Sequence, residues 1–309
     1  MDNSSSTLQF ALGVGGFLLG VGVFYATQRK SPAVFLDGNR KKLTLLEKKP
    51  ISPDAFRLKF SLGSSNTTLG LPHGQHMVFH CPNPVGSIEG EWNGKPNGEK
   101  NAEIMRKYTP ISDDKTSGSV EFVIKMYRPN IKPQFVDGGR MSRFLDNLQI
   151  GESLEVKGPV GKVIYYGKGN FKSSGKQIQV NHVGMIAGGS GITPVYQVTK
   201  AILENPEDKT KISLLYANQT EEDILLRKEL EAFKTAYPDQ FEIAYTLDRP
   251  NPDWGYETGF VTAEMIEKYM PAPASDVAVA MCGPPAMVQT ACIPNLKNLG
   301  YSEDSYFSF

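Results

Sequence analysis

Hydrophobic and polar positions follow three different patterns along the chain. Residues 10–26 form an unbroken run of apolar residues and glycine, which is typical of a helix inside a membrane. Residues 42–166 carry short alternating or β-rich runs, which predict an antiparallel sheet or small barrel. Residues 181–309 alternate apolar strands with helical segments, which predicts a parallel sheet covered on both faces. The expected fold is an N-terminal transmembrane helix, an antiparallel β-barrel domain and an α/β domain.

The predicted β domain, residues 42–166, is interrupted twice by other patterns. A short helix is expected at about residues 142–148, stopping near Gly151. Residues 82–105 are rich in Gly, Pro, Asn and Glu, which indicates a long surface loop or hairpin insertion. A solvated insertion is the simpler interpretation of this segment, and a functional lid is the alternative. The strands are expected at residues 55–60, 76–81, 119–127 and 152–156.

A polar stretch of Gly, Lys, Ser and Asn at residues 167–176 predicts a linker between the domains, placed at residues 167–180. The α/β domain is expected to follow at residues 181–309. Its strands are expected at residues 183–187, 212–217, 241–246 and 277–281. The first helix is expected to follow the glycine turn and end near residue 203, and the other helices are expected at residues 224–237, 262–269 and 286–299.

The apolar run near the N-terminus spans a bilayer only when its neighbours are included. Residues 10–26 give about 25 Å of helix, whereas the hydrocarbon core is about 30 Å thick. Adding Thr7, Leu8, Gln9 and Thr27 extends the helix to roughly 31 Å. A cleaved signal peptide is the alternative, but no basic residue precedes the run. The sequence therefore favours an uncleaved membrane anchor at residues 1–30.

Basic residues follow the anchor and predict its orientation. Residues 31–41 are interpreted as a basic juxtamembrane linker, and basic side chains outnumber Asp37 and Glu47 between residues 29 and 50. The positive-inside rule then leaves the rest of the chain in the cytosol. Binding of the cluster to anionic headgroups and a simple stop-transfer flank both stay open. The basic residues are Arg29, Lys30, Arg40, Lys41, Lys42, Lys48 and Lys49.

Composition excludes some classes of protein. The chain has 33 basic and 33 acidic residues, so it lacks the excess positive charge of a nucleic-acid binder. Its cysteines, Cys81, Cys282 and Cys292, have neither metal-ligand spacing nor the even count of a disulfide framework. We therefore expect no metal site and a reducing compartment for the domains after the anchor.

Two glycine motifs fall at strand ends of the predicted α/β domain. Residues 188–194, Gly-Gly-Ser-Gly-Ile-Thr-Pro, lie between a strand and a helix, where glycine lets the backbone approach a phosphate. Residues 282–285, Cys-Gly-Pro-Pro, follow another strand. Ligands of open α/β sheets bind at the carboxyl ends of strands. Either motif alone is also explained by a tight turn, with Cys282 as a small buried residue.

Two further motifs fall in the predicted β domain. Residues 106–112, Arg-Lys-Tyr-Thr-Pro-Ile-Ser, offer a guanidinium for a diphosphate, an aromatic ring and a hydroxyl. Residues 138–142, Gly-Gly-Arg-Met-Ser, open the short helix and offer backbone N–H groups to an anion, although Ser142 is also explained as an ordinary helix cap. One anion site per domain predicts two phosphorylated cofactors that meet at a domain cleft.

With these motifs in this order, residues 42–309 resemble the ferredoxin-reductase-like flavoproteins, and within them the NADH–cytochrome b5 reductase family. The resemblance implies an N-terminal FAD barrel with one helix and a C-terminal NADH domain. It rests on Arg106-x-Tyr108-Thr109-Pro110-Ile111-Ser112, Gly138-Gly139-Arg140-Met141-Ser142, Gly184 to Pro194, Leu215-Tyr216-Ala217-Asn218, Tyr245-Thr246-Leu247-Asp248, Cys282-Gly283-Pro284-Pro285 and Phe307-Ser308-Phe309.

The resemblance implies roles for the FAD-side residues. Arg106 would hold the FAD phosphates, Tyr108 would lie along the flavin, and Thr109 would face flavin N5. Val123 and Lys125 would line the flavin site. The pyrophosphate would be capped by Gly139, Met141 and Ser142.

On the NADH side, the resemblance implies that Thr193 reaches the flavin and Phe309 finishes the cleft beside it. The nicotinamide and phosphate pocket would be shaped by Gly188, Gly191, Pro194, Cys282, Gly283 and Pro284. Two features depart from the family: Lys107 stands where proline is usual, and the insertion before Arg106 is longer than expected.

The resemblance implies an enzyme that transfers a hydride from NADH to FAD and single electrons to cytochrome b5 or a similar acidic haem protein. Thr109, His76 and Cys282 are its candidate catalytic residues, with a Thr109–His76 proton path as the hypothesis and a strand histidine bonded to backbone as the alternative. Asp248 is the candidate for NADH preference, or else a turn-forming residue. The anchor would hold the enzyme in the endoplasmic reticulum or the mitochondrial outer membrane. A nitrate-reductase-like flavin module and a membrane flavin-binding scaffold without turnover are the alternative functions.

Overall fold

The computed structural model describes residues 33–131 and 135–309. The predicted anchor, residues 1–30, and the first residues of the predicted basic linker lie outside this range. Within the described ranges, no helix is both long and apolar enough to cross a bilayer.

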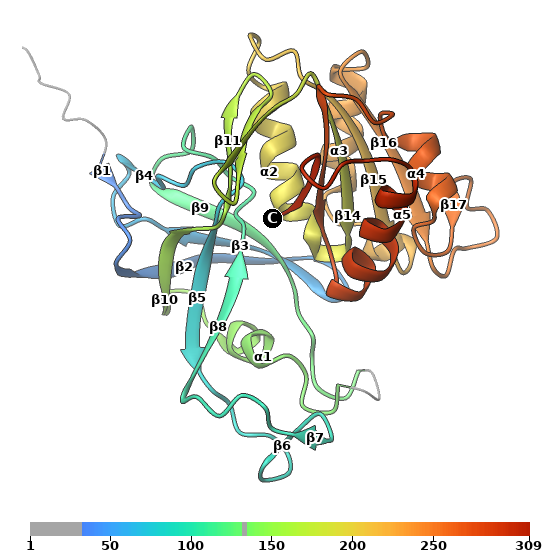
Figure 1. Ribbon diagram of the computed structural model, residues 1–309. Helices are drawn as coiled ribbons and strands as arrows, with labels where there is room; N and C mark the ends of the chain where they lie inside the picture. The colour runs from blue at the N-terminus through green and yellow to red at the C-terminus, as the bar shows by residue number, and fades with distance from the viewer. Residues whose placement is uncertain (1–32, 132–134) are drawn as a thin grey trace, which may run out of the picture. The chain divides into compact units, whose positions relative to one another are not determined.

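The N-terminal half is built on a six-stranded antiparallel sheet, which confirms the predicted strand pattern (Figure 1). The sheet curls until Ile111, just after one edge strand, donates its backbone N–H to the carbonyl of Glu121 on the other edge strand, at 2.9 Å. The strand order is β8-β5-β10-β2-β3-β9, with bounds β2 (Arg40–Ser52), β3 (Ala55–Ser61), β5 (His76–Pro82), β8 (Glu103–Tyr108), β9 (Ser119–Lys125) and β10 (Ser153–Val160).

Alternation along these strands buries an aromatic core. Phe60, Phe79 and Phe122 are fully buried, and the rings of Phe79 and Phe122 lie 4.9 Å apart in an edge arrangement. Helix α1 (Arg140–Asn147) adds Met141 and Leu145 to the same core. Large buried aromatic rings contribute much of the apolar area that stabilises a sheet of this size.

The ends of α1 differ from the prediction. The helix begins after Gly139, which is the N-cap, so Ser142 lies in the first turn and is not the capping residue. It ends at Asn147 because Leu148 is extended, four residues before the expected stop near Gly151. A glycine N-cap has no side-chain signature, so the sequence pattern predicts the start of the helix about two residues too late.

The prediction of a linker without regular structure at residues 167–180 is wrong, because this segment contains two strands. Strand β11 (Val163–Gly167) pairs with β12 (Asn170–Ser173), which pairs with β13 (Lys176–Gln179). Phe171 is fully buried and its ring lies 4.5 Å from that of Tyr165. The strands are short and mostly face solvent, so their composition is polar. Phe171 is the one fully buried residue of β12 and β13, which is too weak a pattern to predict strands from the sequence.

Small two-stranded pairs complete the N-terminal half. Strand β1 (Ala33–Val34) runs parallel to β4 (Thr67–Thr68). Within the predicted insertion, β6 (Glu91–Trp92) and β7 (Lys95–Pro96) form a hairpin. Of the surface loop and the hairpin that the sequence allowed, the hairpin is present. In Figure 1 this hairpin lies beyond α1 at the lower end of the view.

The C-terminal half is a parallel sheet with helices, which confirms the predicted α/β organisation. Its strands read as continuous apolar runs because both faces are covered. The order is β17-β16-β15-β14-β18-β19, with bounds β14 (His182–Gly188), β15 (Lys211–Asn218), β16 (Phe241–Leu247), β17 (Glu257–Thr258), β18 (Val277–Cys282) and β19 (Tyr306–Ser308). The helices are α2 (Ile192–Leu203), α3 (Arg227–Ala236), α4 (Ala263–Tyr269) and α5 (Ile293–Asn298).

Two helices differ from the prediction near their starts. The segment expected to be helical from residue 224 becomes α3 only at Arg227, because Leu226 takes a left-handed backbone with φ of 57°. The other segment is helical at residue 286 as expected, but it becomes a π-helix over Met287–Cys292 before it continues as α5. π-Helical turns inside helices occur often at functional sites.

One apolar core joins the two halves. Ala55, Ile111 and Val123 of the N-terminal half are buried in the same cluster as Val195 and Tyr196 of α2. Polar contacts flank this core: Arg57 pairs with Glu229 at 3.1 Å, Lys200 with Asp113 at 2.5 Å, and the Gln197 side chain accepts the Gly74 N–H at 2.8 Å. The halves are therefore packed into one unit, and the site lies where they meet.

Candidate functional site

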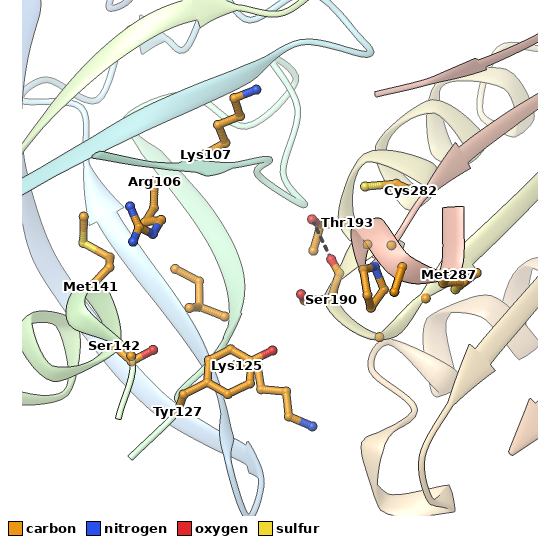
Figure 2. Close-up of a pocket in the computed structure, with 18 of the residues that line it drawn as sticks. Arg106, Lys107, Lys125, Tyr127, Met141, Ser142, Ser190, Thr193, Cys282 and Met287 are labelled. Atoms are coloured by element: carbon orange, nitrogen blue, oxygen red, sulfur yellow. Dashed lines mark hydrogen bonds between the residues drawn. The ribbon is translucent and has the colours of Figure 1, made fainter. Parts of the chain in front are cut away.

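A cavity of about 1140 Å³ lies between the two halves. Its walls come from β5, β8, β9 and α1 on one side and from the strand ends and α2 on the other (Figure 2). Every residue that the sequence analysis placed in the site lines it: His76, Arg106, Tyr108, Thr109, Val123, Lys125, Gly139, Met141, Ser142, Gly188, Gly191, Thr193, Pro194, Asp248, Cys282, Gly283, Pro284 and Phe309.

Strand β8 brings the first motif to the cavity. Tyr108 packs its ring 4.6 Å from that of Phe79, and burial raises the pKa of its hydroxyl. Thr109 is buried just after the end of the strand, and Arg106 reaches the cavity three residues earlier. Figure 2 shows Arg106 on the same side as Met141 and Ser142 of α1. The strand and helix thus place a guanidinium, an aromatic ring and two hydroxyl-bearing side chains along one wall.

The glycine pair before α1 needs to be glycine for steric reasons. Gly138 has a φ of 73°, and a Cβ there would lie 2.5 Å from the Tyr127 carbonyl oxygen. A Cβ on Gly139 would lie 2.9 Å from Ser142 Oγ. The turn holds the helix N-terminus, with its free N–H groups, against the cavity.

The second glycine motif brings the β14 and β18 strand ends into contact. A Cβ on Gly191 would lie 2.2 Å from the Cys282 carbonyl oxygen, and one on Gly188 would lie 2.5 Å from Met287 Sδ. The Thr193 hydroxyl donates to the Ser190 carbonyl at 3.3 Å (Figure 2). The carboxyl ends of parallel strands form the expected binding edge of such a sheet. Pro194 lies in the first turn of α2, where its missing N–H costs no helical bond.

Lys125 joins the two walls. Its ammonium group pairs with Asp54 of its own half at 3.1 Å and with Asp223 of the C-terminal half. Burial raises the pKa of Asp223, but hydrogen bonds from Lys125 and Thr220, together with the Lys125 charge, lower it below its ordinary value. Lys125 and Asp223 expose only 12% and 17% of their side chains, so removing either would leave the other as a poorly solvated charge. The residue expected only to line the site therefore also holds its two sides together.

His76 and Thr109 occupy neighbouring positions on adjacent strands. Met77 pairs with Tyr108 across β5 and β8, so the next positions outward are His76 and Thr109. His76 is buried, and among the described residues its Nε2 has no hydrogen-bond partner. Burial, and then the nearby charge of Lys107, lower its pKa to about 4. The imidazole is therefore neutral at pH 7.

The chemistry of Cys282 follows from its surroundings. Burial raises the pKa of its thiol to about 11, so it is protonated at neutral pH and a poor nucleophile. Cys81, Cys282 and Cys292 are all free thiols. Cys282 therefore shapes the cavity wall by packing and is not a nucleophile.

Asp248 lies directly after β16. Its backbone N–H donates to the Asn218 carbonyl at 3.0 Å, which ties the ends of β15 and β16 together beside the cavity. Burial raises the pKa of its carboxyl group. The position of Asp248 directly after β16 places its carboxyl group at a strand end, where a ribose hydroxyl could donate to it.

Interpreting residues 82–105 as a merely solvated insertion is wrong. Its residues also line the cavity, and Trp92 donates its indole N–H to the Gly138 carbonyl at 3.1 Å. Asp137 accepts the backbone N–H groups of Ser87 and Asn93, each at 2.6 Å. These bonds join segments more than 40 residues apart, so no local pattern could reveal them. The lining residues from the insertion are Trp92, Asn93, Pro96, Gly98 and Glu99.

Comparisons with known proteins give counterparts for both halves. Residues 42–91 and 94–165 match the family model of the oxidoreductase FAD-binding domain, and residues 185–292 that of the oxidoreductase NAD-binding domain. The chain is 44% identical over 306 residues to NADH-cytochrome b5 reductase 2 of Xenopus laevis, covering 97% of this chain and 98% of that protein. It is 43% identical over 317 residues to NADH-cytochrome b5 reductase 1 of Homo sapiens, covering 99% of each.

Among solved structures, the cytochrome b5 reductase domain of Ulva prolifera nitrate reductase superposes with a TM-score of 0.81 at 40% identity. The match covers 90% of this chain and 100% of that domain. The arrangement of the two sheets around the cavity is therefore shared with a solved relative.

His76 makes folding stability depend on pH in a defined direction. Its pKa is about 4 when folded and 6.5 ordinarily, so the unfolded chain binds the proton more readily. Neutral His76 therefore contributes fully to the free energy of unfolding above pH 6.5. As the pH falls toward 4, the free energy of unfolding decreases by up to about 3 kcal/mol. Urea unfolding at pH 7 and pH 4.5 should show a larger acid loss for the natural chain than for His76→Gln. Equal losses would show that the folded pKa is not depressed.

Proposed function

The chain belongs to the NADH-cytochrome b5 reductase family, and from this premise we propose that it binds FAD and NADH in the cavity and transfers electrons to cytochrome b5 or a similar haem protein. The single observation that carries the proposal is one cavity whose opposite walls each hold a glycine-built phosphate cradle. Two cradles facing each other fit two phosphorylated cofactors whose reactive rings meet between them.

The residues present fit FAD by size and by chemistry. The cavity volume of about 1140 Å³ exceeds the range of about 300–1,000 Å³ usual for the pocket of one small ligand. Gly139 leaves no room for a Cβ beside Ser142, so backbone N–H groups can approach a phosphate there. Arg106 adds a guanidinium suited to a diphosphate.

On the FAD side, Arg106 and the N-terminus of α1, with Gly139, Met141 and Ser142, hold the diphosphate. Tyr108 would pack along the flavin, Thr109 would face flavin N5, and Val123 and Lys125 would complete the wall. FAD, when bound, accepts a hydride from NADH and releases electrons one at a time, which joins a two-electron donor to a one-electron haem acceptor.

On the NADH side, the C-terminal strand ends would orient the nicotinamide toward the flavin, and Thr193 and Phe309 line the wall on that side. Orientation of this kind is the protein's main contribution to hydride transfer. The phosphate and nicotinamide pocket is formed by Gly188, Gly191, Pro194, Cys282, Gly283 and Pro284.

Reoxidation also needs a route for the proton at flavin N5, and we assign it to Thr109 and His76. In this route the Thr109 hydroxyl would take the proton lost at flavin N5 and give its own proton to the neutral His76 imidazole, which would release it to solvent. With a folded pKa of about 4 the imidazole is neutral at pH 7 and can accept a proton. Neighbouring register positions in β5 and β8 support this route.

We also propose that residues 1–30 anchor the chain in a membrane, with the described domains on the cytosolic side, at the endoplasmic reticulum or the mitochondrial outer membrane. The support is the uncharged run from residue 3 to residue 28 and the basic residues after it. Carbonate extraction of membranes should leave the full chain in the pellet and release a chain that lacks residues 1–30. Release of both would exclude the anchor.

The alternatives make different demands. A flavin-binding scaffold would hold FAD without reduction by NADH. A nitrate-reductase-like module would work with further domains, whereas the Xenopus laevis and Homo sapiens relatives match this chain over almost their whole lengths. The reductase proposal therefore has the stronger support.

The proposal is tested by purifying the full chain in detergent, identifying the released flavin, and measuring NADH-driven reduction of ferric cytochrome b5. Bound FAD and sustained haem reduction are expected. FAD without turnover would establish the scaffold, and a chain without flavin would overturn the proposal.

The route through His76 predicts a kinetic defect. His76→Ala should slow reoxidation of the reduced flavin by ferric cytochrome b5 by about tenfold or more, as for loss of a positioned acid or base. His76 stays neutral above about pH 4, so the natural rate should show no His76 inflection between pH 6 and 8. Rapid-mixing absorbance measures the rate, and His73→Ala, outside the cavity lining, is the matched control. An unchanged rate in His76→Ala would remove the route.

Asp248 predicts the choice of coenzyme. Its carboxylate accepts from a ribose diol and repels a 2′-phosphate, so Asp248→Thr should reduce the preference for NADH over NADPH by roughly tenfold. The ratio of kcat/KM for the two coenzymes measures the effect. The exposed Asp253→Thr removes the same charge nearby and should leave the ratio unchanged. If Asp248→Thr kept the natural ratio, the preference would lie elsewhere.

A further inference from the structure

Residues 83–99, which belong to the insertion at residues 82–105, also pack on Arg140, the first residue of α1. Arg140 lies with its guanidinium 3.9 Å from the centre of the Trp92 ring. Its Nη1 and Nη2 donate to the side-chain oxygens of Asn83 and Asn97, each at 2.7 Å. Only 5% of the Arg140 side chain is exposed. The insertion therefore holds this cation in a fixed position at the phosphate end of the cavity.

Glu99 adds the only carboxylate that pairs with Arg140 among the described residues. One of its oxygens, Oε2, accepts from Arg106 Nη2 at 2.9 Å and lies 3.2 Å from Arg140 Nε. The Arg106 hydrogen bond lowers the pKa of Glu99, so it is a carboxylate at neutral pH. A single oxygen thus bridges two guanidinium groups.

The bridge involves the guanidinium that Figure 2 shows beside Met141 and Ser142, the group assigned above to the FAD diphosphate. We propose that Glu99 is a built-in competitor for the FAD diphosphate: it occupies Arg106 and Arg140, and it weakens FAD binding to this chain. This inference rests on the proposed function, because it takes Arg106 as a phosphate ligand. Through Glu99, the insertion would set the affinity of this chain for FAD.

The direction of the effect follows from charge. Binding of a diphosphate requires Glu99 to give up or share Arg106, and the carboxylate then lies next to a second anion. Glu99 and Arg106 each expose 42% of their side chains, so the pair itself contributes little to stability and can open. Neutralising Glu99 removes both the competition and the repulsion, and FAD binds more tightly.

A positioning role for Glu99 predicts the opposite result. If the carboxylate served to aim Arg106 at the phosphates, its loss would let the guanidinium turn away and FAD would bind more weakly. The two roles therefore differ in the sign of one measured quantity, the dissociation constant for FAD.

The experiment uses the full chain in detergent, stripped of flavin and titrated with FAD while flavin fluorescence is followed. Glu99→Gln should lower the Kd for FAD by roughly tenfold at low ionic strength, and Glu99→Ala should lower it in the same direction. The gain should shrink at high ionic strength, because salt screens half-exposed charges. Glu89→Gln is the matched control, since Glu89 is an exposed carboxylate of the same insertion with no partner among the contacts that the structure describes.

Each outcome separates this inference from the proposed function. Tighter FAD binding by both Glu99 variants, with Glu89→Gln unchanged, supports the competitor. FAD binding by the natural chain with an unchanged or raised Kd in the Glu99 variants overturns the competitor and leaves the proposed function standing. A natural chain that binds no FAD overturns the proposed function itself.

Discussion

The packing of the antiparallel sheet against the parallel sheet is the contact on which the site depends. Neither half encloses the cavity alone, since the Arg106 and Gly139 wall belongs to one half and the Gly188 and Cys282 wall to the other. The shared apolar core fixes their separation, and Lys125 ties the cavity walls together through Asp223. Hydride transfer needs two rings held at a fixed distance, so the stability of this contact is also a condition of the proposed chemistry.

Charge is distributed unevenly along the cavity. Guanidinium groups and helix N–H groups gather at the proposed phosphate end, where Glu99 offsets part of the positive charge. Where the rings would meet, His76 is neutral and Cys282 is protonated at pH 7, because burial disfavours their charged forms. A site arranged in this way binds anionic cofactors at their ends and leaves the reacting centre without a strong fixed charge apart from nearby Lys107 and Lys125.

Much of this arrangement could be predicted from the sequence, for physical reasons. Strands buried on both faces read as apolar runs, and glycines such as Gly191 stand where no Cβ fits, so the α/β half and its motifs were identifiable. The strands around Phe171 were missed because a solvent-facing sheet has the composition of a linker. The role of Glu99 was missed because its partner Arg140 lies 41 residues away, and such pairing has no local signature.

The most direct test of the account is anaerobic rapid mixing of the full, FAD-loaded chain with NADH, and with NADH carrying deuterium at nicotinamide C4. The account predicts complete bleaching of the flavin absorbance, slowed by deuterium on the transferred face, because the proposed site would hold nicotinamide C4 against flavin N5. Flavin that stays oxidised in excess NADH would contradict the claim that the two walls bring the cofactors together.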